Sequence, residues 1–383
     1  MYTGTLKSAL RVNISNIPGW RTLRKIVVIE SDDWGSVRMS SVKNFNSLKK
    51  AGIPVERNHY NLYDSLESNS DLEMLFEMLS RFKDKTGRPP VMTGVNVVAN
   101  PDFNKIKACD FQEYFYESYT ETLKKYPQHD RVYDLWKEGI LKRLFVPVFH
   151  GREHLNVQRW LRALQQGNKS TLFGFECGIT GIPQRGIDGE KVPSFQAAFD
   201  IDTIEDLEYL KEVLETGLDL FESLYGYKAK FFVPTNGSFN NTLERCLIDK
   251  GVKYIDTAKK QFEPLGNGEY RVNTRFIGQH NQLGQIYLTR NCFFEPSSSG
   301  FEFPTNTDWV NNCLKEIEIA FRWHKPATIS SHRVNYIGFL HPENRERSLK
   351  QFEELLGKML KRWPDIEFMT SMELGDLIAS TKR

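Results

Sequence analysis

The sequence predicts an α/β fold built on a mainly parallel sheet, and three observations support this prediction. Short runs of β-branched and aromatic residues, each the length of a strand, recur along the chain. Segments with apolar residues at helical spacing lie between them. Polar residues follow several strands directly, at the edge where parallel sheets place their chemistry. Strands that alternate with helices indicate a parallel sheet, either open or closed into a barrel.

The predicted strands are short apolar runs. Residues 25–30 (KIVVIE) form a continuous run that suits a strand buried on both faces. Comparable runs predict further strands at 91–98, 145–149, 230–233, 327–331 and 366–369.

The predicted helices lie between these runs, where apolar residues recur three or four positions apart. In 71–85, for example, Leu72, Leu75, Phe76 and Leu79 share one face. The same spacing predicts helices within 111–144, after Asn156, and at 204–225, 243–250, 308–322 and 345–363. Residues 171–200, rich in glycine and proline, are expected to form a long irregular loop.

No Pro/Gly/Ser-rich linker divides the 383 residues. We therefore expect one elaborated domain, 1–383, with a helical insertion at roughly 55–145 and a β-rich insertion at roughly 257–290. The β-rich insertion is indicated by its Asn/Gly turns.

Composition excludes several classes of function. The net charge of +2 gives no electrostatic footprint for nucleic acid. Five scattered cysteines without a C-x-x-C motif argue against a disulfide framework and a thiolate zinc site. No run approaches the roughly 18 apolar residues of a membrane span, and no signal peptide is evident. These features lead us to expect a cytoplasmic protein.

Two clusters after predicted strands contain metal-ligand residue types. Asp32 and Asp33 follow the first strand, and adjacent carboxylates need a cation or a shared proton. His150 ends the strand 145–149, and His154 lies four residues later, which would place both on one helical face within reach of one ion. The alternatives are a helix-capping turn for the aspartates and a surface pair for the histidines. A third strand ends at His332, which is suited to a general acid but could also be structural.

These segments, in order, resemble the motifs of the polysaccharide deacetylase family, the NodB-homology carbohydrate esterases. The resemblance implies a distorted (β/α) barrel and a metal-dependent hydrolase that removes an acyl group from a carbohydrate. It makes Asp32 the general base, and Asp33, His150 and His154 the ligands of one divalent ion. It makes His332 the general acid.

Two further motifs of the family resemble segments of this chain. The turn 233–237 matches a strand-end motif, where Asn236 would supply a backbone N–H to the oxyanion. Asp308 and Trp309 match an Asp-Trp pair, so Asp308 would orient His332. Trp34 and Trp309 are candidate apolar walls for a sugar, although plain core packing is their alternative.

The sequence departs from the family at four points, one of which is that Trp34 stands between the Asp pair and its glycine, Gly35. Gly151 stands where the family has Ser or Thr, and Val233 stands where it has the arginine that holds the base. The segment between Asp33 and His150 is also long for the family. Arg333, a candidate substrate contact, or Arg152 is a candidate to take the role of the missing arginine.

The implied cofactor is one divalent ion, with Zn²⁺ favoured and Fe, Co, Ni or Mn also suited to these ligands. The implied partner is an acylated sugar or polysaccharide precursor. Three rival functions remain. A glycoside hydrolase would pair Asp32 with a loop carboxylate, the candidates being Glu176, Asp200, Asp202 and Glu295. A degenerate carbohydrate-binding barrel would keep the metal without turnover. An inverzincin-type metallopeptidase would use the sequence His-x-x-Glu-His, with Glu153 as its base.

Overall fold

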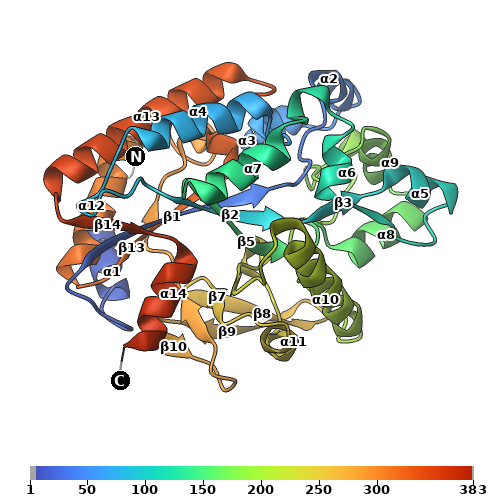
Figure 1. Ribbon diagram of the computed structural model, residues 1–383. Helices are drawn as coiled ribbons and strands as arrows, with labels where there is room; N and C mark the ends of the chain where they lie inside the picture. Colours follow the sequence, from blue (N-terminus) through green and yellow to red (C-terminus); the bar gives the residue numbers. More distant parts are fainter. Residues whose placement is uncertain (1–5, 382–383) are drawn as a thin grey trace.

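The computed structural model describes residues 6–381 and has a ten-stranded, mostly parallel sheet at its centre (Figure 1). From one edge to the other the strands are β10 (Gln279–His280), β11 (Ile286–Leu288), β7 (Tyr254–Asp256), β6 (Phe231–Phe232), β5 (Phe145–Gly151), β2 (Met92–Val97), β1 (Lys25–Trp34), β13 (Ala327–His332) and β12 (Cys292–Phe293), while β14 (Ile366–Met369) also pairs with β1. Only the pair β10–β11 is antiparallel among these described strands. The predicted α/β class with a mainly parallel sheet is confirmed.

The sheet does not close into a barrel within residues 6–381. Strands β10 and β12 end the hydrogen-bonded path, and no pairing joins them. The barrel expected from the resemblance is therefore replaced by an open sheet, because the short β12 pairs with β13 alone.

Strand β1 is buried on both faces because helices cover both sides of the sheet. Val27 and Ile29 belong to a core cluster shared with α4 (Asn69–Ser80), α7 (Val132–Leu141), α12 (Trp309–Arg322) and α13 (Pro342–Arg362). Ile26 and Val28 point the other way and pack with α14 (Ser371–Ser380). The alternation of side chains along a strand thus explains why the run 25–30 is apolar throughout.

The remaining helices lie around this centre. Helices α10 (Asp206–Tyr225) and α11 (Glu244–Asp249) pack beside β5, β6 and β7. The others are α1 (Leu6–Ser15), α2 (Val42–Lys50), α3 (His59–Tyr63), α5 (Phe103–Ala108), α6 (Tyr119–Leu123), α8 (Val157–Gln165) and α9 (Lys169–Glu176). Two small antiparallel pairs stand apart from the main sheet: β3 (Ala99–Pro101) with β4 (Tyr116–Ser118), and β8 (Lys260–Gly266) with β9 (Glu269–Thr274).

Three expectations about chain organisation need correction. Residues 55–145 are not simply a helical insertion, because they contain β2, which pairs with both β1 and β5. Of 257–290, only the hairpin β8–β9 lies outside the main sheet, since β10 and β11 extend its edge. The expected loop 171–200 begins inside α9, whose first turn is capped by the Asn168 side chain accepting from Thr171 N.

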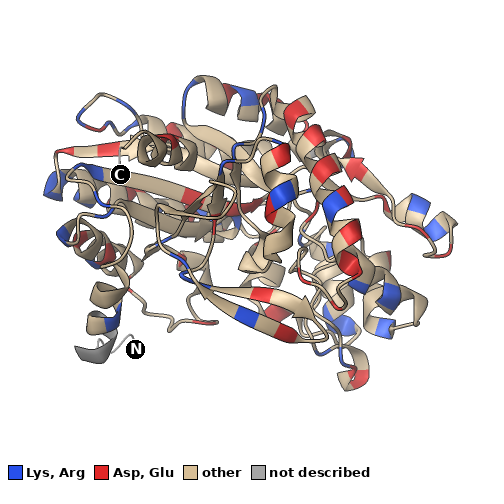
Figure 2. Cartoon of the chain, turned by 90° about the horizontal axis from the view of Figure 1, so that it is seen from below, with Lys and Arg blue, Asp and Glu red and all other residues tan. Residues whose placement is uncertain are grey.

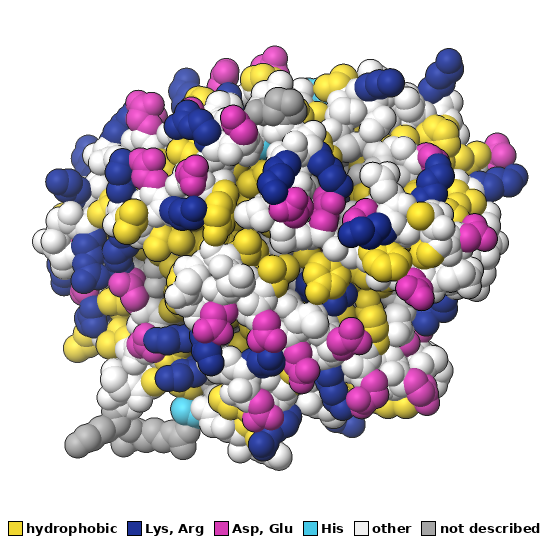
Figure 3. All heavy atoms as spheres, turned by 45° about the vertical axis from the view of Figure 1, so that its right-hand side comes forward, with side chains coloured by type: hydrophobic (Ala, Val, Ile, Leu, Met, Phe, Trp, Pro, Cys, Tyr) yellow, Lys and Arg dark blue, Asp and Glu magenta, His cyan; other side chains and the backbone are white. Residues whose placement is uncertain are grey.

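Charged residues of both signs are interspersed over the helices (Figure 2). On the face in Figure 3, hydrophobic side chains lie in patches between charged ones. Within residues 6–381, none of the helices combines the length and apolarity that crossing a bilayer requires.

Candidate active site

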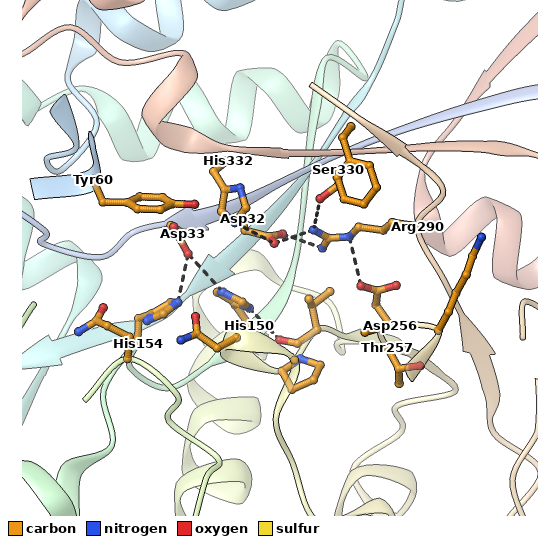
Figure 4. A pocket seen from close by; sticks show the side chains of 18 of the residues that line it. Asp32, Asp33, Tyr60, His150, His154, Asp256, Thr257, Arg290, Ser330 and His332 are labelled. Carbon is orange, nitrogen blue, oxygen red and sulfur yellow. Dashed lines mark hydrogen bonds and ion pairs between the residues drawn. The ribbon is translucent and has the colours of Figure 1, made fainter. Parts of the chain in front are cut away.

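A distortion in β1 brings Asp32 and Asp33 into one cavity. Neighbouring side chains of a regular strand point to opposite faces. Here the pairing of β1 with β2 shifts register between Ser31 and Trp34, and Asp33 has a positive φ of 76°. Such a bulge turns the strand locally, so both carboxylates line the same cavity (Figure 4).

His150 and His154 also line this cavity, but they do not share a helical face as the spacing predicted. His150 lies in β5, whereas His154 lies in the turn before α8. Between them Gly151 has a φ of 134°, and a Cβ there would lie 3.2 Å from the Phe199 ring. This left-handed backbone conformation and the close ring favour glycine at position 151.

The resulting trio of Asp33, His150 and His154 has the spacing of metal ligands. The Asp33 Oδ1 atom lies 3.5 Å from His150 Nε2 and 3.2 Å from His154 Nε2, and all three ligand atoms lie within 4.8 Å of one another. Ligands bonded to a tetrahedral zinc at about 2.0–2.1 Å would be about 3.3–3.4 Å apart. The trio thus fits one small divalent ion.

The protonation of His150 supports the same interpretation. Its Nδ1 atom donates to the Val233 carbonyl oxygen at 2.7 Å, which leaves the lone pair on Nε2. That Nε2 atom is buried and has no hydrogen-bond partner among the described residues. Burial alone would raise the pKa of Asp33, but His154 and His150 hold it well below its usual value. The site therefore presents an ionised carboxylate and an available imidazole nitrogen.

Arg290 holds Asp32 in a bidentate ion pair. Its Nη1 and Nη2 atoms donate to Asp32 Oδ2 and Oδ1 at 2.6 and 2.7 Å. Burial alone would raise the pKa of Asp32. The Arg290 guanidinium lowers it by more than burial raises it, so the pKa of Asp32 lies below its usual value. Arg290 thus performs the role for which Arg333 and Arg152 were the candidates.

Two more buried carboxylates surround the same guanidinium. Arg290 Nε donates to Glu30 Oε2 at 2.5 Å and lies 3.1 Å from Asp256 Oδ2. Burial raises the pKa of both Glu30 and Asp256, despite the opposing effect of Arg290. Asp32 is therefore the one carboxylate of these three whose pKa lies below its usual value.

His332 lies beside Asp32 because β1 and β13 pair in register at this point. Its Nε2 atom lies 3.8 Å from Asp32 Oδ2, and its Nδ1 atom donates to Glu295 Oε1 at 2.6 Å. Burial lowers the pKa of His332, but the Glu295 carboxylate outweighs this effect, and the pKa rises to about 10. The imidazolium therefore has a proton to give at neutral pH.

Glu295 takes the orienting role that the sequence suggested for Asp308. Asp308 is exposed, does not line the cavity, and instead caps α12 by accepting from Asn311 N at 3.0 Å. Its position before a helix explains this role, since a short carboxylate satisfies a free backbone N–H there.

Replacing Glu295 by Gln is expected to lower kcat by about 10- to 100-fold, because the amide keeps a hydrogen bond to His332 but removes the charge that stabilises the imidazolium. Asp308→Asn, which keeps the helix cap, should leave kcat unchanged. Steady-state kinetics of both variants on the same substrate check this prediction. Equal losses in the two variants would contradict the assignment of Glu295.

Three of the four proposed substrate contacts do not reach the cavity. Trp34 is fully buried and donates to Ser31 Oγ, and Trp309 is buried against Phe303. Arg333 is fully buried, paired with Asp64 and Glu67 at 3.0 and 2.8 Å. These side chains pack the core. Asn236 does line the cavity.

The cavity measures about 680 Å³ and also contains Tyr60 of α3. The Tyr60 ring meets the His332 ring edge-on, with centroids 5.5 Å apart. In Figure 4 its hydroxyl points towards the space beside Asp32, Asp33 and His332. No pattern in the sequence pointed to Tyr60, because α3 is a five-residue helix far from the strand motifs.

Arg290 and Glu295 could have been found from sequence by one signal that was overlooked. Arg290 follows β11 by two residues and Glu295 follows β12 by two residues. Strand β11 runs parallel to β7, and β12 runs parallel to β13, so their C-terminal ends reach the same edge of the sheet as Asp32 and His332.

Comparisons with known proteins add little to this geometry. No family model and no curated protein matches the chain. Among solved structures, an allantoinase is 10% identical, with 94% of this chain and 93% of that chain covered and a TM-score of 0.46. A protein from Mycobacterium smegmatis assigned to the polysaccharide deacetylases is 10% identical, covers 95% and 93%, and has a TM-score of 0.44. A 4-alpha-glucanotransferase from Thermococcus litoralis is 12% identical and has a TM-score of 0.42. The match covers 91% of this chain but only 40% of the transferase. At identities of 10–12% and TM-scores of 0.42–0.46, these similarities assign neither a family nor a function.

Proposed function

We propose that this protein is a metal-dependent hydrolase that removes an acyl group from a carbohydrate, as a divergent NodB-like polysaccharide deacetylase. The observation that carries the proposal is that Asp32 and His332, whose charge states suit a general base and a general acid, line the same cavity as the Asp33-His150-His154 trio. Asp32 is ionised beside Arg290, and His332 is protonated beside Glu295.

The side chains divide the reaction between them. A divalent ion on the trio would polarise the acyl carbonyl and the attacking water. Asp32 accepts a proton from that water as its oxygen bonds to the acyl carbon. His332 donates its Nε2 proton to the departing nitrogen or oxygen as the bond from the acyl carbon breaks. The Tyr60 hydroxyl and the Asn236 backbone N–H, which line the same cavity, would hold the substrate.

The rival functions have weaker support. Of the glycosidase candidates, Asp200 and Asp202 pair with Arg159 and Glu176 pairs with Lys107, all away from the cavity. The fourth, Glu295, does not line the cavity and is hydrogen-bonded to His332. Glu153, the base of a metallopeptidase, is buried and paired with Arg152 at 2.7 Å. The rival of a carbohydrate-binding protein without turnover rested on the absence of an arginine that holds the base. Arg290 holds Asp32, so this argument no longer applies.

Metal removal provides the test. Dialysis against a chelator is expected to reduce acetate release from acetylated sugars by at least about 1000-fold, since the ion supplies several kcal/mol of transition-state stabilisation. Stoichiometric Zn²⁺ or another divalent ion should restore it. Acetate release that is unaffected by the chelator, or cleavage of a glycosidic or peptide bond instead, would contradict the proposal.

A further inference from the structure

The cavity extends well beyond the groups that perform the reaction. Its far end is formed by α1, the loop after β7, β12 and α12, which contribute Ser15, Lys259, Phe293 and Glu316. None of these side chains has a part in the mechanism above.

Lys259 is a half-buried cation without a carboxylate partner. Its Nζ atom donates to Ser15 Oγ at 3.1 Å, and no carboxylate oxygen among residues 6–381 lies within ion-pair distance. Burial lowers the pKa of Lys259, and the nearby Cys292 and Glu316 side chains oppose this effect only in part. By contrast, Arg290 in the same cavity meets three carboxylates.

Glu316 lines the same end of the cavity as Lys259, but no ion pair joins these two side chains among the described residues. Burial raises the pKa of Glu316 to about 7. Its Oε2 atom accepts from the Phe293 backbone N–H at 2.8 Å rather than from the ammonium. Since a cation withdrawn from water without a counter-ion is costly, the far end is suited to receive an anion.

We propose that the far end of the cavity binds an anionic group of the substrate, a carboxylate or a phosphate, through Lys259. The substrate class is then an acidic carbohydrate, whose acyl group reaches the trio while its negative charge meets the ammonium. The identification of the bound molecule as a substrate rests on the proposed function, but the anion preference does not.

Binding of small probes tests the inference without turnover. Titrations of the metal-loaded protein, followed by calorimetry, compare methyl glucuronide and glucose 6-phosphate with methyl glucoside. We expect at least one anionic probe to bind about 10-fold or more tightly than the neutral one, as a charge-assisted hydrogen bond allows. Which anion gains more distinguishes a carboxylate from a phosphate ligand.

Matched variants assign the preference to Lys259. Lys259→Met should bring the affinity ratio close to one, whereas Lys260→Met, at the exposed neighbouring position, should leave it unchanged. Ser15→Ala removes the one hydrogen-bond partner but not the charge, so the preference should persist. No anion preference in the wild type, or one that survives Lys259→Met, would overturn the inference. If the wild-type protein hydrolysed no acylated substrate, the proposed function would be wrong, but the anion preference would still hold.

Discussion

Replacing His154 by Ala is expected to remove the divalent ion and lower acyl hydrolysis by at least about 1000-fold, which corresponds to about 4 kcal/mol of transition-state stabilisation. The trio offers three ligand atoms within 4.8 Å of one another, and two do not hold a catalytic ion firmly. Metal content per chain, measured by elemental analysis, and kcat/KM on an acetylated sugar check the result. His280→Ala is the control, because His280 is exposed and lies outside the cavity.

The matched variant Asp32→Asn separates metal binding from catalysis. Asp32 lies beside the trio but is paired with Arg290, so the amide should leave the metal content unchanged. Loss of the general base should nevertheless reduce kcat by about 10²- to 10⁴-fold. If Asp32→Asn lost the ion together with activity, Asp32 would be a ligand and the assignment of the base would be wrong.

The parts of the site that could be predicted from sequence are those fixed by local pattern. Asp32 follows the run 25–30 closely, and His150 directly follows 145–149, so each residue's place at the sheet edge follows from its own strand. His332 follows from β13 in the same way, and its register opposite Asp32 completes the site. For His154 the expected proximity is observed but the expected helix is not, because a turn brings the two rings to 5.1 Å between centroids.

The parts that could not be predicted depend on the order of strands and on long side chains. Arg290 and Asp32 are 258 residues apart, and their contact depends on the chain after β11 passing to the other end of the strand order, where β12 pairs with β13. Arg333 was an attractive candidate because it adjoins His332, yet its side chain points to Asp64 and Glu67 in the core. Neighbours in sequence at a strand end can face opposite sides, so adjacency alone does not assign a role.

Arg290→Gln is expected to lower both stability and activity, and the two effects can be distinguished. The guanidinium is the common partner of Glu30, Asp32 and Asp256, which are all buried. Removing one member of a buried ionic group leaves uncompensated charge and costs about 3–5 kcal/mol of unfolding free energy. Denaturant titration measures this loss.

The catalytic effect of Arg290→Gln is measured on protein shown to be folded and metal-loaded. Without the two hydrogen bonds at 2.6 and 2.7 Å, Asp32 loses both its orientation and the charge that keeps it ionised, so kcat should fall by about 10²-fold or more. Arg290→Lys keeps the positive charge but loses the bidentate geometry, so its kcat should lie between those of the wild type and Arg290→Gln.

Arg159→Gln is the control for a purely structural loss, because Arg159 also joins two carboxylates, Asp200 and Asp202, but outside the cavity. It should lose stability while it keeps kcat. A double-mutant cycle of Arg290→Gln with Asp32→Asn decides whether the two residues act together. Once Asp32 is neutral, removing Arg290 should change kcat little, since its catalytic effect is exerted through that carboxylate. If the two losses in kcat were fully additive, Arg290 would act on the reaction independently of Asp32. Its ion pair with Asp32 would then not be what prepares Asp32 to act as the base.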